Sequence, residues 1–187
     1  MLQGLYEGAR QDANSREHEV PLHELEKQAR SARPVRSALD ALSPRDRIHV
    51  ISEIKRKSPS KGELADIDDP VALAQEYEAG GASMISVLTE SRRFGGSLAD
   101  LHAVSAAVDI PVLRKDFLES EYQIVEARAA GADVVLLIMA GITDERAERL
   151  LEVAREWEMQ ALVEAHTAEE VDRAIAVGAG IVGVNAR

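Results

Sequence analysis

Four ionisable residues lie at the ends of short apolar runs rich in β-branched residues. Glu53 and Lys55 close the first run, Lys115 follows the third run, and Glu164 closes the fifth. If the runs are parallel strands of a barrel, their carboxyl ends meet around one mouth. Two lysines and two carboxylates gathered there would shift one another's pKa values. This composition suits acid–base chemistry on an anionic substrate.

Two further features follow strand ends. The basic stretch 55–62 comes directly after the first run, and its glycine spacing differs from that of a P-loop. We interpret it as a loop that holds a phosphate or carboxylate, rather than a solvated charged loop. Phe94 and Phe117 are the two phenylalanines, and they either bind a planar aromatic group or simply pack there. No histidine belongs to a ligand cluster, so no metal site is predicted, and His166 is expected to be a loop or core residue.

The elements that must position these residues alternate regularly. The predicted strands are 48–54, 83–88, 111–114, 133–138, 161–164 and 180–184, and the predicted helices are 70–79, 98–108, 120–130, 143–156 and 167–177. Alternating strands and helices indicate βα units around a parallel sheet. Both a doubly wound open sheet and a (β/α) barrel accept this pattern. Polar residues at the carboxyl ends of several strands favour the barrel.

Local signals mark the helix ends. Glycine-containing triplets at 80–82, 131–133 and 178–180 separate helices from strands and are predicted helix stops. Thr143 and Thr167 are predicted N-caps, and Glu170, three residues after Thr167, predicts a capping box there. Residues 1–47 carry three helical pieces, the third at 35–42, with few large apolar residues. We expect them to form an extension that docks on a barrel domain of residues 48–187.

Composition excludes several classes of function. The chain has 187 residues and a formal net charge of −11, which argues against general binding to nucleic acid or acidic membranes. It has no cysteine, so disulfides and thiolate chemistry are excluded. No apolar run approaches the roughly 18–20 residues that span a bilayer. No signal-peptide core is present, so we expect a cytoplasmic protein.

Five motifs in chain order resemble those of indole-3-glycerol-phosphate synthase. They are residues 53–60, 87–90 with 94–97, 113–117, 162–164 and 183–187. The resemblance implies a (β/α)8 barrel with an N-terminal helical extension, working in tryptophan biosynthesis. It implies a carboxy-lyase that closes the pyrrole ring of 1-(2-carboxyphenylamino)-1-deoxyribulose 5-phosphate, giving indole-3-glycerol phosphate, CO2 and water. No cofactor is implied, and the partner is this phosphorylated, anthranilate-derived small molecule.

The resemblance also implies roles for single residues. Lys115 would be the general acid at the substrate's ketone oxygen, and Glu164 would serve the dehydration as acid and base. Lys55 would contact the substrate carboxylate, and Glu53 would position the two lysines. The implied substrate-binding residues are Ser58 for the phosphate, Phe94 and Phe117 for the anthranilate ring, and Asn185 and Arg187.

The sequence departs from the family pattern in length. About 250 residues are typical of such a barrel, and six strands are visible here. We therefore expect that two βα units are missing from this chain, and that a longer protein, another chain or domain swapping between copies supplies them. One alternative is an inactive incomplete barrel that acts as a self-associating module. A weaker one is another phosphate-binding barrel, such as a phosphoribosyl isomerase.

Overall fold

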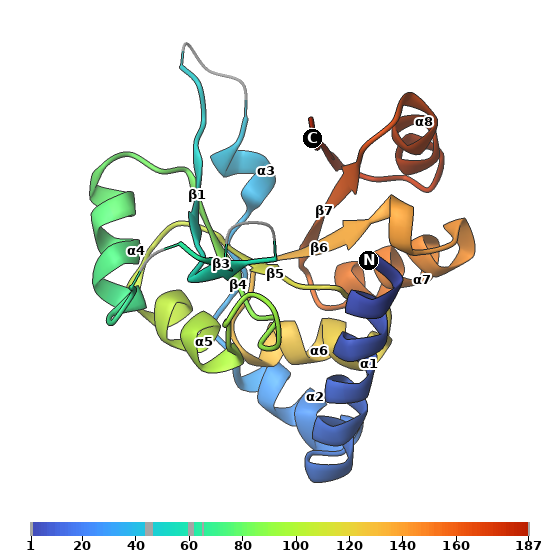
Figure 1. Cartoon of the computed structure of the whole chain (residues 1–187), viewed down its shortest axis with the longest axis horizontal. Helices are drawn as coiled ribbons and strands as arrows, with labels where there is room; N and C mark the ends of the chain where they lie inside the picture. The colour runs from blue at the N-terminus through green and yellow to red at the C-terminus, as the bar shows by residue number, and fades with distance from the viewer. Residues whose placement is uncertain (1, 44–46, 60–61, 65, 187) are drawn as a thin grey trace.

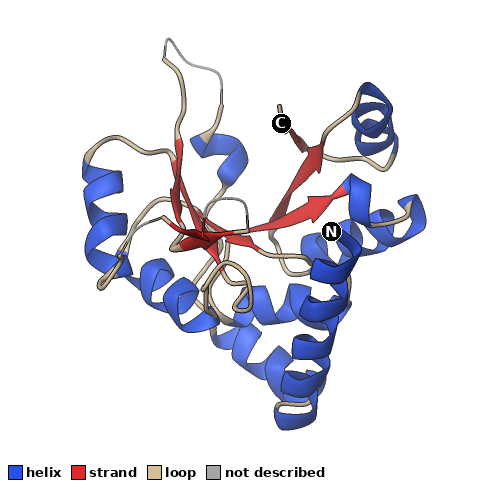
Figure 2. Ribbon diagram, in the orientation of Figure 1, coloured by secondary structure: helices blue, strands red, loops and turns tan. Residues whose placement is uncertain are grey.

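The computed structural model describes residues 2–43, 47–59, 62–64 and 66–186 of the chain. Three helices come first: α1 (Leu2–Glu19), α2 (Leu22–Ser31) and the short α3 (Ala38–Ala41). The remaining helices are α4 (Pro70–Ala79), α5 (Leu98–Ala107), α6 (Glu121–Ala129), α7 (Asp144–Glu156) and α8 (Ala168–Ala176), with a 3-10 turn η1 (Met139–Gly141). Helices α4 to α8 surround the curved sheet from outside (Figures 1 and 2).

The main sheet settles the choice between the two candidate folds. Its strands are β1 (Ile51–Ile54), β4 (Met84–Leu88), β5 (Val112–Lys115), β6 (Val134–Ile138), β7 (Gln160–Ala165) and β8 (Ile181–Val184). They are hydrogen-bonded in the order β1-β4-β5-β6-β7-β8, and every pair is parallel. A doubly wound sheet reverses its strand order part-way, whereas this order follows the chain. The fold is therefore of the (β/α) barrel type, with six strands forming a curled half-barrel.

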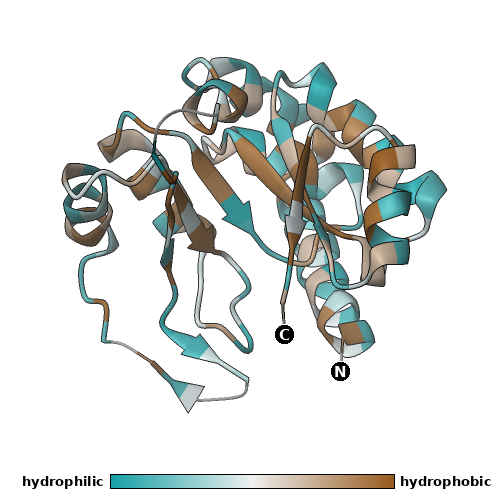
Figure 3. Cartoon of the chain, turned by 90° about the horizontal axis from the view of Figure 1, so that it is seen from above, coloured by the Kyte–Doolittle hydropathy of each residue, from teal (hydrophilic) through white to brown (hydrophobic). Residues whose placement is uncertain are grey.

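The sheet carries a core on each face. On the concave face Met84, Leu113 and Leu136 pack together, and Ala38 of α3 joins them. The larger core lies between the convex face and the helices, where Ile85, Val112 and Val135 are buried among helix side chains. Strands β4 and β6 are buried along their whole length, as expected for parallel strands that are covered on both faces. Hydropathic colouring shows these strands as the apolar centre of the molecule (Figure 3).

The predicted helix boundaries are largely confirmed. Gly81, Gly131 and Gly178 have φ between 82° and 92°, the left-handed conformation in which glycine ends a helix. Thr143 and Thr167 accept hydrogen bonds from backbone N–H groups three residues later, as N-caps do. The capping box predicted at Thr167 is half formed, because the Glu170 carboxylate accepts from the backbone N–H of His166 instead. A complete capping box occurs at the start of α6, where Ser120 and Gln123 satisfy each other's backbone.

Two predicted elements are shorter than expected. The first strand begins at Ile51 rather than at residue 48, since its ladder with β4 begins at the Ile51–Met84 pair. Ile48, before it, is 89% exposed. The third helical piece was predicted at 35–42 but spans only α3, because the backbone N–H of Arg36 donates to the Asp133 carboxylate. A small hairpin of β2 (Lys57–Ser58) and β3 (Gly62–Glu63) was not predicted.

The N-terminal helices dock on the barrel as predicted. Helix α2 packs along α6, and α1 contacts both α6 and η1. The segment after α2 is bound to the amino end of β6, where the Arg33 guanidinium makes two hydrogen bonds of 2.6 and 2.8 Å to the Asp133 carboxylate. Whether residues 1–47 form a separate domain stays a prediction.

Candidate active site

Two lysines share one carboxylate at the carboxyl ends of β1 and β5. The Lys115 Nζ lies 2.8 Å from Glu53 Oε2, and the Lys55 Nζ lies 2.5 Å from Glu53 Oε1. Glu53 lies within β1, Lys55 follows that strand directly, and Lys115 is the last residue of β5. Strand β4 separates β1 from β5, so sheet curvature is what brings these side chains together. The grouping predicted from the sequence is confirmed for these three residues, which we call the lysine cluster.

Opposing influences set the pKa of the Glu53 carboxyl. Burial on its own would raise this pKa, whereas the hydrogen bonds from Lys115 and Lys55 lower it. The hydrogen bonds prevail, so the pKa lies below its usual value and the carboxylate stays ionised. The lysine cluster thus holds one negative and two positive charges, a local excess of positive charge at the ends of β1 and β5. That excess favours an anionic ligand or a developing negative charge.

A second polar group lies at the ends of β7 and β8. The Asn185 side-chain amide donates to Glu164 Oε1 over 3.1 Å. The His166 Nε2 lies 3.4 Å from the same oxygen, and His166 is a loop residue, as predicted. We call Glu164, Asn185 and His166 the glutamate cluster. Within the described part of the chain, no hydrogen bond or ion pair joins it to the lysine cluster, so the predicted single gathering consists of two groups along one edge.

Aromatic rings lie at this edge as well. The ring centroids of Phe94 and Phe117 are 6.1 Å apart. Tyr6 of α1 packs edge-on against Phe117 with centroids 5.5 Å apart. Burial, followed by the charges of Glu119 and Glu164, raises the pKa of the Tyr6 phenol far above its ordinary value, so the phenol stays protonated. Sequence reasoning missed Tyr6, although it shares the apolar face of α1 with Ala9 and Ala13.

The loop after β4 is held by a carboxylate that the sequence reasoning also missed. Glu90 is buried, and its carboxylate accepts hydrogen bonds from the backbone N–H groups of Arg92, Arg93 and Phe94. The Phe94 carbonyl in turn accepts from the backbone N–H of Lys57, at the start of the hairpin. The loop that carries Phe94 is thereby tied to the basic stretch after β1.

Two predicted substrate-binding residues, Ser58 and Arg187, remain to be placed. Ser58 lies in β2 and pairs with Gly62 of β3. Arg187 lies outside the described residues, so its predicted role remains a prediction.

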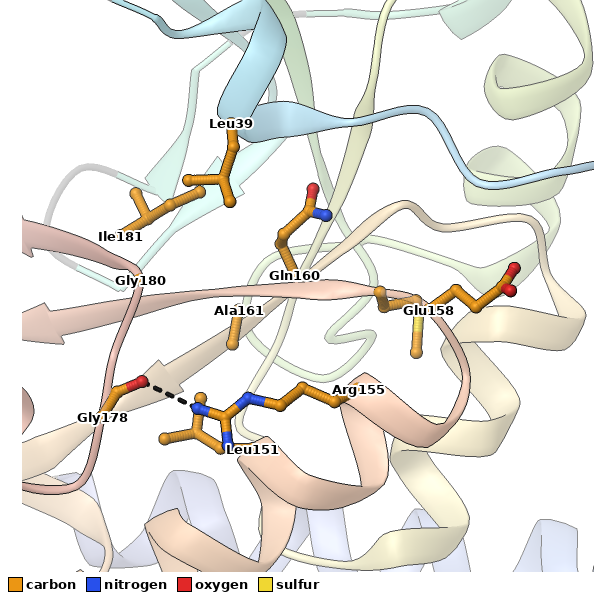
Figure 4. Close-up of a pocket in the computed structure, with 10 residues that line it drawn as sticks. Leu39, Leu151, Arg155, Glu158, Gln160, Ala161, Gly178, Gly180 and Ile181 are labelled. Carbon is orange, nitrogen blue, oxygen red and sulfur yellow. Dashed lines mark hydrogen bonds between the residues drawn. The ribbon is translucent and has the colours of Figure 1, made fainter.

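A cavity of about 300 Å³ lies at the opposite end of the sheet (Figure 4). It is lined by Gln160 and Ile181, the first residues of β7 and β8, and by Leu39 of α3. The Arg155 guanidinium donates to the Gly178 carbonyl over 2.8 Å at its border. Because barrel enzymes work at the carboxyl ends of their strands, we assign the chemistry to the other edge.

The described residues offer neither a metal site nor a membrane-spanning helix. Among them, no three His, Cys, Asp or Glu side chains are grouped so that they could hold a metal ion. None of their helices combines the length and apolar character that crossing a membrane requires.

Comparisons with known proteins agree with the geometry. The family model described as "Indole-3-glycerol phosphate synthase" matches residues 2–187. A protein of that name from Leifsonia xyli subsp. xyli is 56% identical over the whole chain, which covers 72% of that protein. The relative from Arthrobacter sp. is 55% identical, with 70% of it covered, and one from Streptomyces coelicolor is 54% identical, with 69% covered.

A solved structure shows the same fold. The N-acetylmannosamine-6-phosphate 2-epimerase from Clostridium perfringens superposes with a TM-score of 0.57, covering 80% of this chain and 65% of that one. Its sequence identity is 13%, so this likeness concerns the fold alone.

Proposed function

The chain belongs to the indole-3-glycerol phosphate synthase family, and we propose that its lysine and glutamate clusters carry out this family's reaction. The activity is that of a carboxy-lyase in tryptophan biosynthesis. The substrate, 1-(2-carboxyphenylamino)-1-deoxyribulose 5-phosphate, loses CO2 and water as its pyrrole ring closes. The family match over the whole chain favours this activity over an inactive self-associating module or a phosphoribosyl isomerase.

Lys115 is the general acid of ring closure. As the aromatic ring attacks the ketone carbon, negative charge develops on the ketone oxygen, which must then receive a proton. An ammonium supplies both the stabilising charge and the proton. Glu53, 2.8 Å from the Lys115 Nζ, orients that ammonium toward the reacting oxygen. This ion pair is the observation that carries the proposal.

Lys55 binds the substrate carboxylate that leaves as CO2. Lys55 contacts Glu53 Oε1, while Lys115 contacts Glu53 Oε2. One carboxylate therefore sets the spacing of the two ammonium groups. Arg187 is a second partner for the substrate carboxylate through its planar guanidinium.

Glu164 serves the later dehydration. Expelling hydroxide requires an acid, and restoring aromaticity requires a base, so a carboxyl group that alternates between both forms can serve both steps. Asn185 donates to Glu164 Oε1 and holds the carboxylate in orientation. Phe94 and Phe117 enclose the anthranilate ring, and Ser58 binds the phosphate.

The test is an assay of the purified chain for indole-3-glycerol phosphate by product fluorescence. We expect product from the chain itself or from a chimera that adds the part of the Leifsonia xyli relative left uncovered by the match. Lys115→Ala should lower kcat by at least about 10²-fold. Lys27→Ala is the control, since Lys27 is also paired with a glutamate, Glu24, but lies on α2. A folded chimera without activity, or a fully active Lys115→Ala variant, would contradict the proposal.

A further inference from the structure

A buried ionic network lies behind β5, on the face opposite to Lys115. Side chains alternate along a strand, so Lys115 shares the concave face with Leu113, whereas Arg114 points to the convex face. Leu113 belongs to the concave core, and Val112 belongs to the core beneath the helices. Arg114 is 0% exposed, and no step of the proposed reaction uses it.

The Arg114 guanidinium is bound on all sides. Its Nη2 lies 3.1 Å from Asp116 Oδ2, and its Nη1 lies 2.9 Å from Glu126 Oε2 of α6. Its Nε donates to Thr89 Oγ1 over 3.1 Å. Arg16 of α1 also binds Glu126, with one hydrogen bond to each carboxylate oxygen. Two arginines and two carboxylates therefore balance in charge, and we call this group the Arg114 network.

Asp116 connects the network to the end of β5. Its Oδ1 accepts from the backbone N–H of Phe117 over 2.9 Å, and its Oδ2 accepts from the Thr89 hydroxyl over 2.6 Å. The backbone N–H of Thr89 donates to the Lys115 carbonyl over 3.0 Å. The backbone N–H of Phe117 is thus bound to a carboxylate of the network. The Lys115 carbonyl is bound to the backbone of Thr89, whose hydroxyl contacts both Asp116 and Arg114.

Stability by itself does not account for this arrangement. A buried ion pair loses hydration on folding, and well-packed apolar side chains of similar size often stabilise a protein as well or better. Ionic groups with directed hydrogen bonds fix positions that apolar packing leaves free to adjust. Position matters here because a displacement of 1 Å in a catalytic group can lower a rate about 10²-fold.

We propose that Arg114, Asp116 and Thr89 are positioning residues, which fix the end of β5 so that Lys115 and Phe117 face the substrate together. The inference rests on the proposed role of Lys115 as the general acid. It extends that role from the concave face of β5 to side chains on the convex face, none of which touches the substrate.

The test compares two carboxylates of the same guanidinium. Asp116→Asn replaces one of the two carboxylate oxygens, both of which accept hydrogen bonds, by an NH2 group. We expect kcat to fall about 10- to 100-fold while KM changes less than about threefold. Glu126→Gln makes the same chemical change on the α6 side, at matched burial, and Glu126 contacts β5 through the Arg114 guanidinium rather than through the backbone of Lys115 or Phe117. It should lower the melting temperature to a similar degree and leave kcat within about threefold of wild type.

A second pair of variants covers the case in which Asp116→Asn fails to fold. Thr89→Val keeps the side-chain shape and removes the hydroxyl, whereas Thr89→Ser keeps the hydroxyl. We expect kcat to fall in Thr89→Val and to stay near the wild-type value in Thr89→Ser. Equal losses of kcat per folded molecule in Asp116→Asn and Glu126→Gln, or in Thr89→Val and Thr89→Ser, would overturn the proposal.

A readout without turnover separates this inference from the proposed function. The side-chain amine signal of Lys115, assigned by its disappearance in Lys115→Arg, is followed by heteronuclear NMR. The signal should shift or broaden in Asp116→Asn and Thr89→Val, and should stay in place in Glu126→Gln. An unmoved signal in every variant would overturn the positioning role. An inactive wild-type protein with a displaced signal in Asp116→Asn would instead refute only the proposed function.

Discussion

The two ends of the sheet use the same kind of ionic grouping for different purposes. At the carboxyl end, Glu53 binds two lysines; at the amino end, Asp133 binds two arginines, Arg33 and Arg36. The Asp133 side chain is 0% exposed and also accepts the backbone N–H groups of Arg36 and Val112. The Glu53 side chain is 23% exposed, and its partners are flexible lysine side chains.

We interpret this difference as that between a structural group and the proposed functional one. Asp133 is enclosed by donors, two of them backbone N–H groups, so it joins the N-terminal extension to β5 and β6 permanently. Glu53 receives its main bonds from partly exposed ammonium groups, which can rotate toward a substrate without unfolding the chain. The same substitution, carboxylate to amide, should therefore have different consequences at Asp133 and at Glu53.

The largest effect is expected from Asp133→Asn. Removing one partner of a buried ion pair usually costs about 3–5 kcal/mol of stability. Because the Asp133 side chain is fully buried while that of Arg33 is 23% exposed, the free energy of unfolding in urea should fall by about 3 kcal/mol, the lower end of that range. Asp109→Asn is the control, since Asp109 is an exposed aspartate directly before the strand segment that Asp133 binds. The rate of ring closure per folded molecule should not change. A stable Asp133→Asn variant with impaired catalysis would reverse the assignment.

Glu53→Gln should have the opposite effect: a lower rate of turnover with little change in stability. Without the carboxylate the two ammonium groups lose their common partner, and we expect kcat to fall about 10²- to 10³-fold with a small change in melting temperature. Glu24→Gln is the control, because it removes the carboxylate from the exposed Lys27–Glu24 ion pair on α2. It should leave kcat unchanged. Unimpaired turnover in Glu53→Gln would show that the cluster is not the reaction site.

Glu90→Gln is expected to have a smaller effect on both properties. The glutamine keeps one oxygen acceptor but loses charge-assisted bonds to three backbone N–H groups. A loss of about 1–3 kcal/mol in stability follows, together with a higher KM because Phe94 shifts. Equilibrium unfolding and steady-state kinetics measure the two effects. An unchanged KM in a destabilised variant would separate this loop from substrate binding.

The smallest effect concerns pH. Because the pKa of Glu53 is lower in the folded protein, its stabilising contribution is complete above the unfolded pKa of about 4.3 and is lost as pH falls through the folded pKa. The difference in unfolding free energy between wild type and Glu53→Gln should therefore narrow as the pH falls below about 4.3. Urea titrations at a series of pH values measure it. A constant difference would mean that the pKa of Glu53 is not lowered by folding.

The elements that the sequence predicted well carry local signals. Gly81, Gly131 and Gly178 adopt the left-handed conformation that their position after helices predicts. Lys115 and Glu164 lie at strand ends because apolar runs precede them. These features depend on neighbours in sequence, so they could be predicted without the fold.

Other features depend on contacts between distant segments. Residues 48–50 were predicted as strand but precede the ladder that β1 forms with β4, and nothing in their own residue types signals this. Tyr6 contacts Phe117 because α1 packs against η1, at the carboxyl end of β6. Glu90 holds its loop because three backbone N–H groups of that loop donate to its carboxylate. The buried Arg114 was part of a recognised motif, but its partner Glu126 lies on α6, and Arg16, which binds Glu126, lies on α1.

The most direct test of the central claim is an NMR titration of the isotopically labelled protein with indole-3-glycerol phosphate. The expected result is that signals of Lys115, Phe117 and Asn185 shift in a saturable manner, whereas those of Asp133 and Arg33 stay in place. Saturable shifts centred on Asp133 and Arg33, with Lys115 and Phe117 unmoved, would contradict it and place ligand binding at the amino end of the sheet.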